Sequence, residues 1–234
     1  MQISRKIKAI FFDAGGTLFR PYPSVGEIYA RAASSYGRTY RPEALETEFH
    51  SAWKKRGGLS SMGTKTNEEK ERSWWHSLVR EVFEPHGGVP DFDNFFKALH
   101  RSFEEKHLWE IYSEVPDVLE DLRRKKFVLG VVSNWDLRLP KVLKNLGLES
   151  YFDFSVSSSM CGATKPSEKI FKEALKQAKV QPEEAAHVGD TYEEDFVGAN
   201  RVGIKAILLD RAKSGNSVPK HLRINSLNEL HDRI

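Results

Sequence analysis

Two aspartates in this chain stand directly after apolar runs. Asp13 follows the run from Lys6 to Phe12, and Asp190 follows the run from Ala185 to Gly189. A Gly-Gly-Thr turn begins two residues after Asp13, and its backbone N–H groups could approach an anion closely. A carboxylate held in such a turn can attack phosphorus or carbon and form a covalent intermediate. An ordinary turn or cap aspartate is the alternative interpretation of Asp13 taken alone.

A hydroxyl, an amide and an ammonium group follow two other runs. Ser133 and Asn134 come after the run from Phe127 to Val132, and Lys165 comes after the loop that follows Phe152 to Val156. All three side chains can donate hydrogen bonds to phosphate oxygens. Lys165 stands just ahead of a predicted helix, where the helix dipole disfavours a cation, so an acidic or phosphate partner is expected. Taken singly, these residues could equally be a helix cap and a solvated lysine.

Asp195 adds a third carboxylate, five residues after Asp190 and within the first turns of the next predicted helix. If Asp13, Asp190 and Asp195 converge against Lys165 alone, their like charges would raise their pKa values or push them apart. A divalent cation removes this conflict. A set of oxygen ligands favours Mg²⁺, which binds few protein carboxylates and retains several waters.

The elements that must position these residues are strands alternating with helices. The apolar runs are bounded by turn or helix signals and indicate buried strands, and a further strand is predicted over Ile204 to Leu209. Helices are predicted over residues 116–126, 137–146, 167–178 and 193–201, with a short one over 227–233. The fold class is therefore α/β, with a doubly wound, Rossmann-like parallel sheet covered on both faces. Ligands bind outside the carboxyl ends of such strands, so Asp13, Ser133, Lys165 and Asp190 should meet at one edge.

The alternation is interrupted once, after the first strand. Helical patterns cover residues 24–36, 42–55, 67–83 and 92–108, with Ser24 and Asn67 as predicted caps and Pro42 at a helix start. We predict an all-helical insert, with the core domain formed by residues 1–19 and 111–234 and the inserted domain by residues 20–110.

Four ordered motifs in the chain resemble those of the haloacid dehalogenase superfamily of hydrolases. They are Phe12-Asp13-Ala14-Gly15-Gly16-Thr17-Leu18, Val132-Ser133-Asn134, Lys165-Pro166 and Gly189-Asp190-Thr191 with Asp195 and Gly198-Ala199. The helical insert resembles the cap of the first subgroup of that superfamily. Trp74-Trp75 and the form of the first motif are similar to the group named haloacid dehalogenase-like hydrolase domain-containing protein 3.

The resemblance implies a role for each matching residue. Asp13 matches the nucleophile that becomes an aspartyl-phosphate, and Thr17 matches the residue that orients it. Ser133 and Lys165 match the groups that clamp the phosphate, and Asn134 is expected to join them in binding substrate. The implied function is a Mg²⁺-dependent phosphatase acting on a small phosphorylated molecule.

The resemblance also implies metal contacts. Asp190 matches a direct Mg²⁺ ligand alongside Asp13, the main-chain carbonyl of Gly15 matches a further contact, and Asp195 matches an outer-shell or lysine-orienting carboxylate. At Gly15, however, the phosphatase pattern has a second aspartate that acts as general acid and then base. Such help is worth about 10²–10⁴-fold in rate. We therefore expect weak activity, or activity restricted to good leaving groups.

Two other functions remain open. In a hydrolytic dehalogenase, Asp13 would attack carbon without a metal. In a low-turnover binding protein, the phosphate and metal site would persist with little catalysis. A lysine in the insert (Lys54, Lys55 or Lys65) could form a Schiff base, although exposed lysines on a helix face explain these residues equally simply. Metal dependence separates the phosphatase from the dehalogenase.

Composition sets few further limits. The formal net charge of +3 in 234 residues predicts no nucleic-acid partner. One cysteine, Cys161, excludes an intramolecular disulfide and fits a reducing compartment. The start of the chain is too short and too charged for a secretory signal, and no apolar run is long enough to span a membrane. We expect a cytoplasmic monomer or weak dimer that does not bind membranes.

Substrate selection is expected to come from the insert. Trp74 and Trp75 cannot share one helix face, so at least one should belong to the core. The candidate selecting residues are Tyr22, Lys54, Arg56, Trp74, Trp75 and His76.

Overall fold

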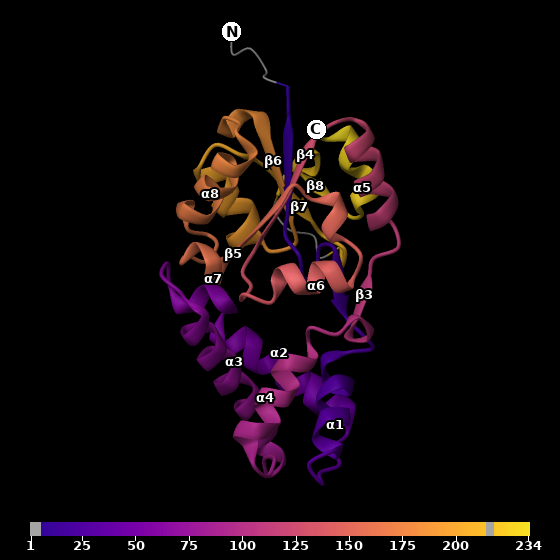
Figure 1. Ribbon diagram of the computed structural model, residues 1–234, viewed down its shortest axis with the longest axis vertical. Coiled ribbons are helices and arrows are strands. Elements are labelled where there is room, and N and C mark those ends of the chain that lie inside the picture. The colour runs from indigo at the N-terminus through magenta and orange to yellow at the C-terminus, as the bar shows by residue number, and fades with distance from the viewer. Residues whose placement is uncertain (1–5, 214–217) are drawn as a thin grey trace.

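The computed structural model describes residues 6–213 and 218–234. Figure 1 shows a sheet flanked by helices in one half of the molecule and a group of helices in the other half. The sheet has six strands in the order β5-β4-β1-β6-β7-β8, and every neighbouring pair is parallel. Its strands are β1 (Ala9–Phe12), β4 (Val128–Ser133), β5 (Phe154–Ser157), β6 (Ala185–Gly189), β7 (Lys205–Leu209) and β8 (Arg223–Ile224). The predicted doubly wound parallel sheet is confirmed.

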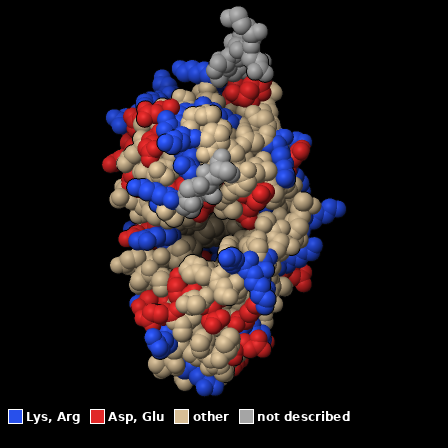
Figure 2. Space-filling view, turned by 180° about the vertical axis from the view of Figure 1, so that it is seen from behind, with Lys and Arg blue, Asp and Glu red and all other residues tan. Residues whose placement is uncertain are grey.

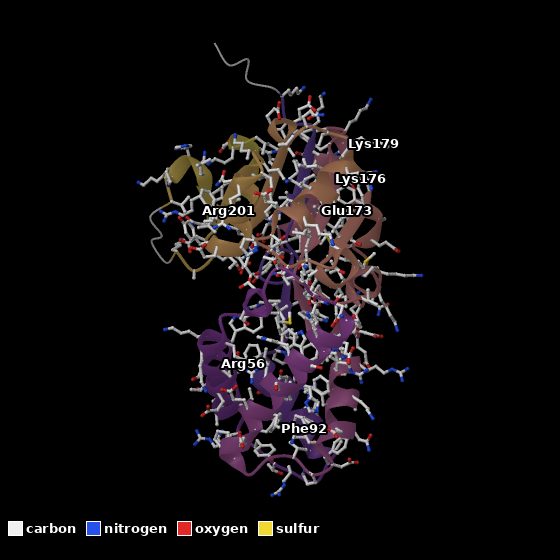
Figure 3. All side chains as sticks on the ribbon, turned by 90° about the vertical axis from the view of Figure 1, so that its left-hand side faces the viewer. Arg56, Phe92, Glu173, Lys176, Lys179 and Arg201 are labelled. Carbon is white, nitrogen blue, oxygen red and sulfur yellow. The ribbon has the colours of Figure 1, made fainter. Side chains whose placement is uncertain are left out.

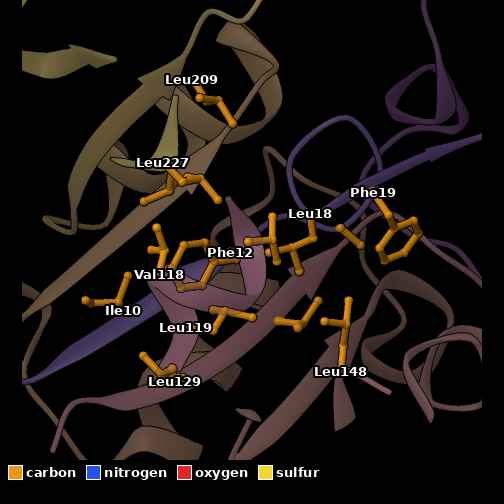
Figure 4. Close-up of a cluster of buried hydrophobic side chains, with 14 of the residues drawn as sticks. Ile10, Phe12, Leu18, Phe19, Val118, Leu119, Leu129, Leu148, Leu209 and Leu227 are labelled. Atoms are coloured by element: carbon orange, nitrogen blue, oxygen red, sulfur yellow. The ribbon is translucent and has the colours of Figure 1, made fainter. Parts of the chain in front are cut away.

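Alternate residues of β1 pack into two separate hydrophobic layers. Ile10 and Phe12 belong to one cluster, shown in Figure 4, and Ala9 and Phe11 belong to the other. The first layer is covered by α5 (Val115–Arg124) and α6 (Leu139–Asn145), and the second by α8 (Glu168–Ala178) and α9 (Gly198–Arg201). This two-sided burial explains why the strand reads as a continuous apolar run. It also fixes the end of β1, and with it Asp13, at the middle of the sheet edge.

The inserted segment forms four helices with a hydrophobic cluster of their own. They are α1 (Val25–Ser34), α2 (Pro42–Arg56), α3 (Glu68–Phe83) and α4 (Phe92–Ser102). The side chains of Ser24 and Asn67 accept hydrogen bonds from backbone N–H groups in the first turns of α1 and α3, as their predicted cap roles require. We call α1–α4 and their connecting loops the helical unit.

A short antiparallel ribbon joins the helical unit to the sheet. It pairs β2 (Phe19–Pro21) with β3 (Trp109–Ile111), and the predicted domain boundaries after residues 19 and 110 fall inside it. Neither strand was predicted, because three residues are too few to show a period. The predicted helix over 92–108 is correspondingly too long. It ends at Ser102, whose hydroxyl donates back to the carbonyl of Leu99, and β3 follows within a few residues.

Other differences lie near the ends of strands. The predicted helix over 193–201 is a π-helical turn, η6 (Tyr192–Val197), followed by α9, and the chain after Pro219 contains β8 in addition to the short helical segment. A one-turn helix, α7 (Ser158–Cys161), was missed. The remaining short helical turns are η1 (Leu59–Met62), η2 (Glu84–His86), η3 (Lys106–Leu108), η4 (Glu149–Tyr151), η5 (Pro182–Glu184), η7 (Lys220–Leu222) and η8 (Leu227–Asp232). Among the described residues, no helix combines the length and apolar character needed to cross a membrane.

Candidate active site

Asp13 is the first residue after β1, and its carboxylate is buried. Its Oδ1 atom accepts hydrogen bonds from the hydroxyl of Ser133, at 2.8 Å, and from Nζ of Lys165, at 2.6 Å. Within the described parts of the chain, no group donates to the second oxygen, Oδ2. Burial raises the pKa of Asp13, Lys165 opposes this shift, and the charge of Asp195 adds to it. Two donors therefore fix one carboxylate oxygen and leave the other available for attack.

Lys165 is fully buried and bridges two carboxylates. Its Nζ atom lies 2.6 Å from Oδ1 of Asp13 and 2.6 Å from Oδ1 of Asp195. Burial alone would disfavour the ammonium, but these two charges outweigh it and raise the pKa of Lys165 above its ordinary value. Lys165 was predicted to have one acidic partner, and it has two, Asp13 and Asp195.

Asn134 holds the backbone of Lys165. Its Oδ1 accepts from the Lys165 N–H at 2.6 Å, and its Nδ2 donates to the Lys165 carbonyl at 3.1 Å and to Oε2 of Glu194 at 2.9 Å. The amide that was expected to bind substrate is therefore occupied in positioning the lysine. Glu194 was not singled out from the sequence, and burial raises its pKa while Lys165 opposes the shift.

Asp195 is buried with both carboxylate oxygens occupied. Oδ1 accepts from Lys165 and lies 2.8 Å from Nε2 of His187, and Oδ2 accepts from the backbone N–H of Thr191 at 3.1 Å. Burial alone would disfavour the charge, but Lys165 and His187 lower the pKa of Asp195. A side chain at Gly189 would overlap the Asp195 carboxylate, which explains the glycine there. These contacts fit the lysine-orienting role better than direct metal binding.

His187 lies inside the buried strand β6 and was missed in the sequence. The signal available was a polar imidazole in the middle of an otherwise apolar run, where a buried hydrogen-bond partner is required.

Asp13, Asp190 and Asp195 each offer a carboxylate oxygen, and the three oxygens lie within 4.8 Å of one another. Solvent reaches Asp190, yet the surrounding protein removes much of its hydration and the charges of Asp13 and Asp195 repel it, raising its pKa to about 8. Such a group of oxygen donors with excess negative charge suits a hard divalent cation. Of the predicted metal residues, the carboxylates of Asp13 and Asp190 are the available donors, because both oxygens of Asp195 are already occupied.

The turn after Asp13 is held by an arginine that was not predicted. Arg211 donates to the carbonyls of Gly16, at 3.2 Å, and Thr17, at 2.8 Å, and its guanidinium also pairs with Glu114 at 2.6 Å. Thr17 is fully buried, and its Oγ1 has no hydrogen-bond partner among the described residues. No hydrogen bond links the Thr17 hydroxyl to Asp13, so its predicted orienting role rests on the resemblance.

The two glycines of the turn differ. Gly16 has φ of +81°, and a Cβ there would overlap the Asp190 carboxylate, whereas Gly15 lies outside the positive-φ region. A Cβ at Gly15 would stand 3.3 Å from the ring edge of Trp135, which is a tight contact but not an overlap. The backbone therefore requires glycine at position 16 and permits a side chain at position 15.

A cavity of about 450 Å³ lies above these residues, between the sheet edge and the helical unit. Asp13, Gly15, Ser133 and Asp190 line its floor, and the hollow between the two halves is visible in Figure 2. His100 and Glu194, neither of which was predicted, also line it.

Of the candidate selecting residues, only Trp75 lines the cavity. Both Trp74 and Trp75 are half-buried at the edge of the helical cluster, so the prediction that one would lie in the core is wrong. Arg56 pairs with Glu81 and stacks over Trp74. The others lie at the surface: Tyr22 and Lys54 are exposed, and His76 pairs with Asp93.

The lysines Lys54, Lys55 and Lys65 are exposed and do not line the cavity, which favours their interpretation as helix-face or loop lysines. Figure 3 shows Lys176 and Lys179 near the end of the molecule remote from the helical unit that carries Arg56 and Phe92. Lys176 and Lys179 therefore lie far from the helical unit.

Comparisons with known proteins agree with this geometry. A family profile described as haloacid dehalogenase-like hydrolase matches residues 7–203. The chain is 32% identical to human haloacid dehalogenase-like hydrolase domain-containing protein 3, over 96% of this chain and 92% of the human protein.

Two solved structures illustrate the structural similarity. The magnesium-bound HAD-hydrolase YfnB from Bacillus subtilis superposes with a TM-score of 0.80 at 17% identity, covering 97% of this chain and 98% of YfnB. The 2-haloacid dehalogenase from Pseudomonas syringae superposes with a TM-score of 0.64 at 25% identity, covering 97% of both chains. The motifs, the sheet and these matches together place the chain in the haloacid dehalogenase-like hydrolase family.

Proposed function

We propose that this hydrolase is a divalent-metal-dependent phosphatase that acts through a phosphorylated Asp13. The observation that carries the proposal is the balance of charge around Asp13. Oxygens of three carboxylates lie within 4.8 Å of one another, and Lys165 pairs with two of these groups, Asp13 and Asp195, but not with Asp190. A phosphate monoester would add further negative charge, so productive binding requires a cation such as Mg²⁺. When bound, that cation would neutralise this charge and polarise the phosphoryl oxygens.

The protein groups define the reaction. Ser133 and Lys165 hold Oδ1 of Asp13, which leaves Oδ2 to attack phosphorus. The bond from phosphorus to the leaving oxygen breaks, and that oxygen keeps the electron pair. Water then cleaves the phosphate from Asp13, which releases inorganic phosphate and restores the carboxylate. Because Gly15 carries no acid or base, neither proton transfer receives help there, and substrates with stable leaving groups are favoured.

The helical unit acts in this proposal as the cap. Residues 20–110 close over the sheet edge and supply most of the cavity wall, while the core formed by residues 1–19 and 111–234 supplies the reacting groups. Cys161 is a free thiol and fits a reducing compartment, so we assign the activity to the cytoplasm. The partner is a small phosphorylated molecule, bound by a monomer or weak dimer.

The cavity also bears on dehalogenation. The carboxylate of a 2-haloacid needs a cation that is free to pair with it, and Arg138 is the one arginine among the described cavity residues, which include no lysine. Its guanidinium is already held by both oxygens of Asp136, at 2.6–3.0 Å. With Asp190 also present, a metal-free haloacid site is electrostatically disfavoured.

The decisive experiment offers the purified protein two small substrates. Acetyl phosphate has a good leaving group, and 2-chloropropionate tests dehalogenation; each is assayed with Mg²⁺ and with chelator, and Asp13→Asn is the control. Phosphate release that requires both Mg²⁺ and Asp13 supports the proposal. Chloride release in chelator would replace it with dehalogenation. Phosphate binding without turnover of either compound would replace it with a binding role.

A further inference from the structure

The wall of the cavity above Asp13 is aromatic. The helical unit supplies Phe49, Trp53, Trp75 and Phe96 among other apolar residues, and Trp109 of the ribbon and Trp135 of the half that contains the sheet also line it. The rings brace one another: Trp53 lies 5.7 Å from Trp75, and Trp109 lies 5.4 Å from Trp135, measured between ring centroids. Phe96 is buried and the other five are half-buried, so the wall is held in place by packing yet retains uncovered ring surface.

The charged groups of the cavity do not favour a second anion. Arg138 is paired with Asp136, as described above, and also donates to the carbonyl of His100. The remaining charged residues that line the cavity are the carboxylates of Asp13, Asp190 and Glu194. A substrate that carried a carboxylate or a second phosphate away from the reacting phosphoryl group would find no free lysine or arginine among the described lining residues. An uncharged remainder avoids this cost.

The size of the cavity sets the scale of that remainder. A volume of about 450 Å³ falls within the ordinary range of small-molecule sites, which is roughly 300–1,000 Å³. It has room for a phosphoryl group at Asp13 and a fused aromatic ring against the tryptophans. Aromatic pairs in offset or edge-to-face geometry contribute beyond their buried area, so a flat ring suits this wall.

We propose that the substrate class of this site is a monophosphate ester of an uncharged aromatic alcohol. This inference rests on the proposed function and deepens it. The aromatic wall favours an aryl group, and Gly15 in the floor favours a stable leaving group, which an aryl oxide is. Oδ2 of Asp13 takes the phosphoryl group, the phosphorus–oxygen bond to the aryl group breaks, and the aryl oxide leaves with the electron pair. It takes its proton from water. An aryl oxide needs no acid at position 15, and the rings hold the aryl group.

The test compares 1-naphthyl phosphate with acetyl phosphate in the presence of Mg²⁺. Acetyl phosphate can contact only the residues of the cavity floor, whereas naphthyl phosphate can contact both the floor and the aromatic wall. We expect a KM for naphthyl phosphate about tenfold or more below that for acetyl phosphate. Trp75→Ala should raise the KM for naphthyl phosphate about tenfold and raise the KM for acetyl phosphate by much less.

Tyr36→Ala is the control, because Tyr36 is also a half-buried aromatic residue of the helical unit, lies outside the cavity lining and packs on Phe95. It should leave both KM values within about twofold. A second matched pair tests charge: 4-carboxyphenyl phosphate should have a KM at least about tenfold above that of 4-methylphenyl phosphate.

The outcomes separate the two proposals. Hydrolysis of acetyl phosphate with no lower KM for naphthyl phosphate overturns the aromatic substrate class and leaves the proposed function in place. Equal effects of Trp75→Ala on both substrates, or equal KM values for the charged and uncharged phenyl esters, do the same. Failure to hydrolyse either phosphate removes both proposals.

Discussion

The carboxylate of Asp190 lies directly against the α-carbon of Gly16, so closely that a Cβ at position 16 would overlap it. Gly16 also has φ of +81°, so two independent constraints meet at one residue. The metal-site carboxylate and the turn that follows the nucleophile are therefore packed as one unit, with Arg211 holding the turn from the other side.

Gly16→Ala should lose both activity and stability. A left-handed conformation costs a residue with a side chain about 1–2 kcal/mol, and the collision with Asp190 adds to this. Gly15→Ala is the matched control, since φ at position 15 is not left-handed and the added Cβ would stand 3.3 Å from a tryptophan ring edge without overlapping a carboxylate. Urea denaturation and acetyl phosphate hydrolysis provide the readouts. Equal loss in the two variants would show that the contact with Asp190 is not the cause.

Mg²⁺ should stabilise the folded protein through Asp190. A ligand present at 100 times its Kd stabilises a protein by about 2.7 kcal/mol. Melting curves in Mg²⁺ and in chelator should therefore differ for the wild type and coincide for Asp190→Asn. Glu193→Gln, beside the site but exposed and outside the group of three carboxylates, should retain the shift. If Mg²⁺ raised the melting temperature of Asp190→Asn as much as that of the wild type, the cation would bind at a site that does not include Asp190.

Asp13→Asn should abolish turnover without unfolding the protein. The amide is a poor nucleophile, so the loss should reach at least about 10⁴-fold in kcat. Its oxygen can still accept from Ser133 and Lys165, and burial already disfavours the charged form of Asp13, so the melting temperature should hold or rise. Ser133→Ala provides a comparison that keeps the nucleophile. Residual turnover in carefully purified Asp13→Asn would contradict a covalent route through this residue.

The convergence of Asp13, Ser133, Lys165 and Asp190 could be predicted because parallel strands end at one sheet edge. Each of these residues follows an apolar run that the sequence displays clearly. The direction of the Asn134 amide could not be predicted, because it depends on where the Lys165 loop passes. The contact of Arg211 with the turn could not be predicted either, because Arg211 is separated from Gly16 by 195 residues and from Thr17 by 194 residues in the chain.

The cavity wall was less predictable than the floor. Trp74 and Trp75 are neighbours in the sequence, and only the packing of α3 against α2 decides which ring reaches the cavity. The ribbon of β2 and β3 brings Trp109 there from a segment that the sequence places at the end of a helix. Short strands and the packing between helices depend on tertiary contacts, and the hydrophobic periodicity of the local sequence does not reveal these contacts.

Glu71 should make the stability of the protein depend on pH. It lies on α3, and its Oε1 accepts from the hydroxyl of Ser158 at 2.6 Å, across the contact between the helical unit and the sheet-bearing half. Burial raises its pKa from 4.5 to about 7, although hydrogen bonds from nearby hydroxyls oppose the shift. A carboxyl whose pKa is raised on folding stabilises the protein below its unfolded pKa, and this contribution is lost as pH rises through the folded value.

Glu71→Gln should remove that loss, because the amide stays neutral and can still accept from Ser158. The difference in unfolding free energy between the variant and the wild type should shift in favour of the variant as pH rises from 5 to 8, by up to about 3 kcal/mol. Glu69→Gln on the same helix is exposed and should show no such gain. Urea denaturation at both pH values measures the difference. An equal effect at pH 5 and pH 8 would mean that Glu71 titrates normally.

Gly15 should make the second half of the reaction slow. An aryl phosphate can phosphorylate Asp13 without an acid, but water must then attack the aspartyl-phosphate without the base that a carboxylate at position 15 would supply. That help is worth about 10²–10⁴-fold. Rapid mixing with 4-nitrophenyl phosphate should therefore release a burst of nitrophenol equal to the enzyme concentration, followed by a slower steady rate.

Gly15→Asp should remove the burst, raise the steady rate and speed the hydrolysis of alkyl phosphates most. Position 15 has φ outside the left-handed region, and an added Cβ would stand 3.3 Å from the Trp135 ring, so that ring must move by a few tenths of an ångström. Gly15→Asn, which has a similar size but cannot transfer the proton, should keep the burst. If the wild type instead hydrolyses an alkyl phosphate at about 10 s⁻¹ without a burst, another residue supplies the proton. The cavity then offers His100 from the cap and Glu194 from the core, and each would be tested by its amide or alanine variant.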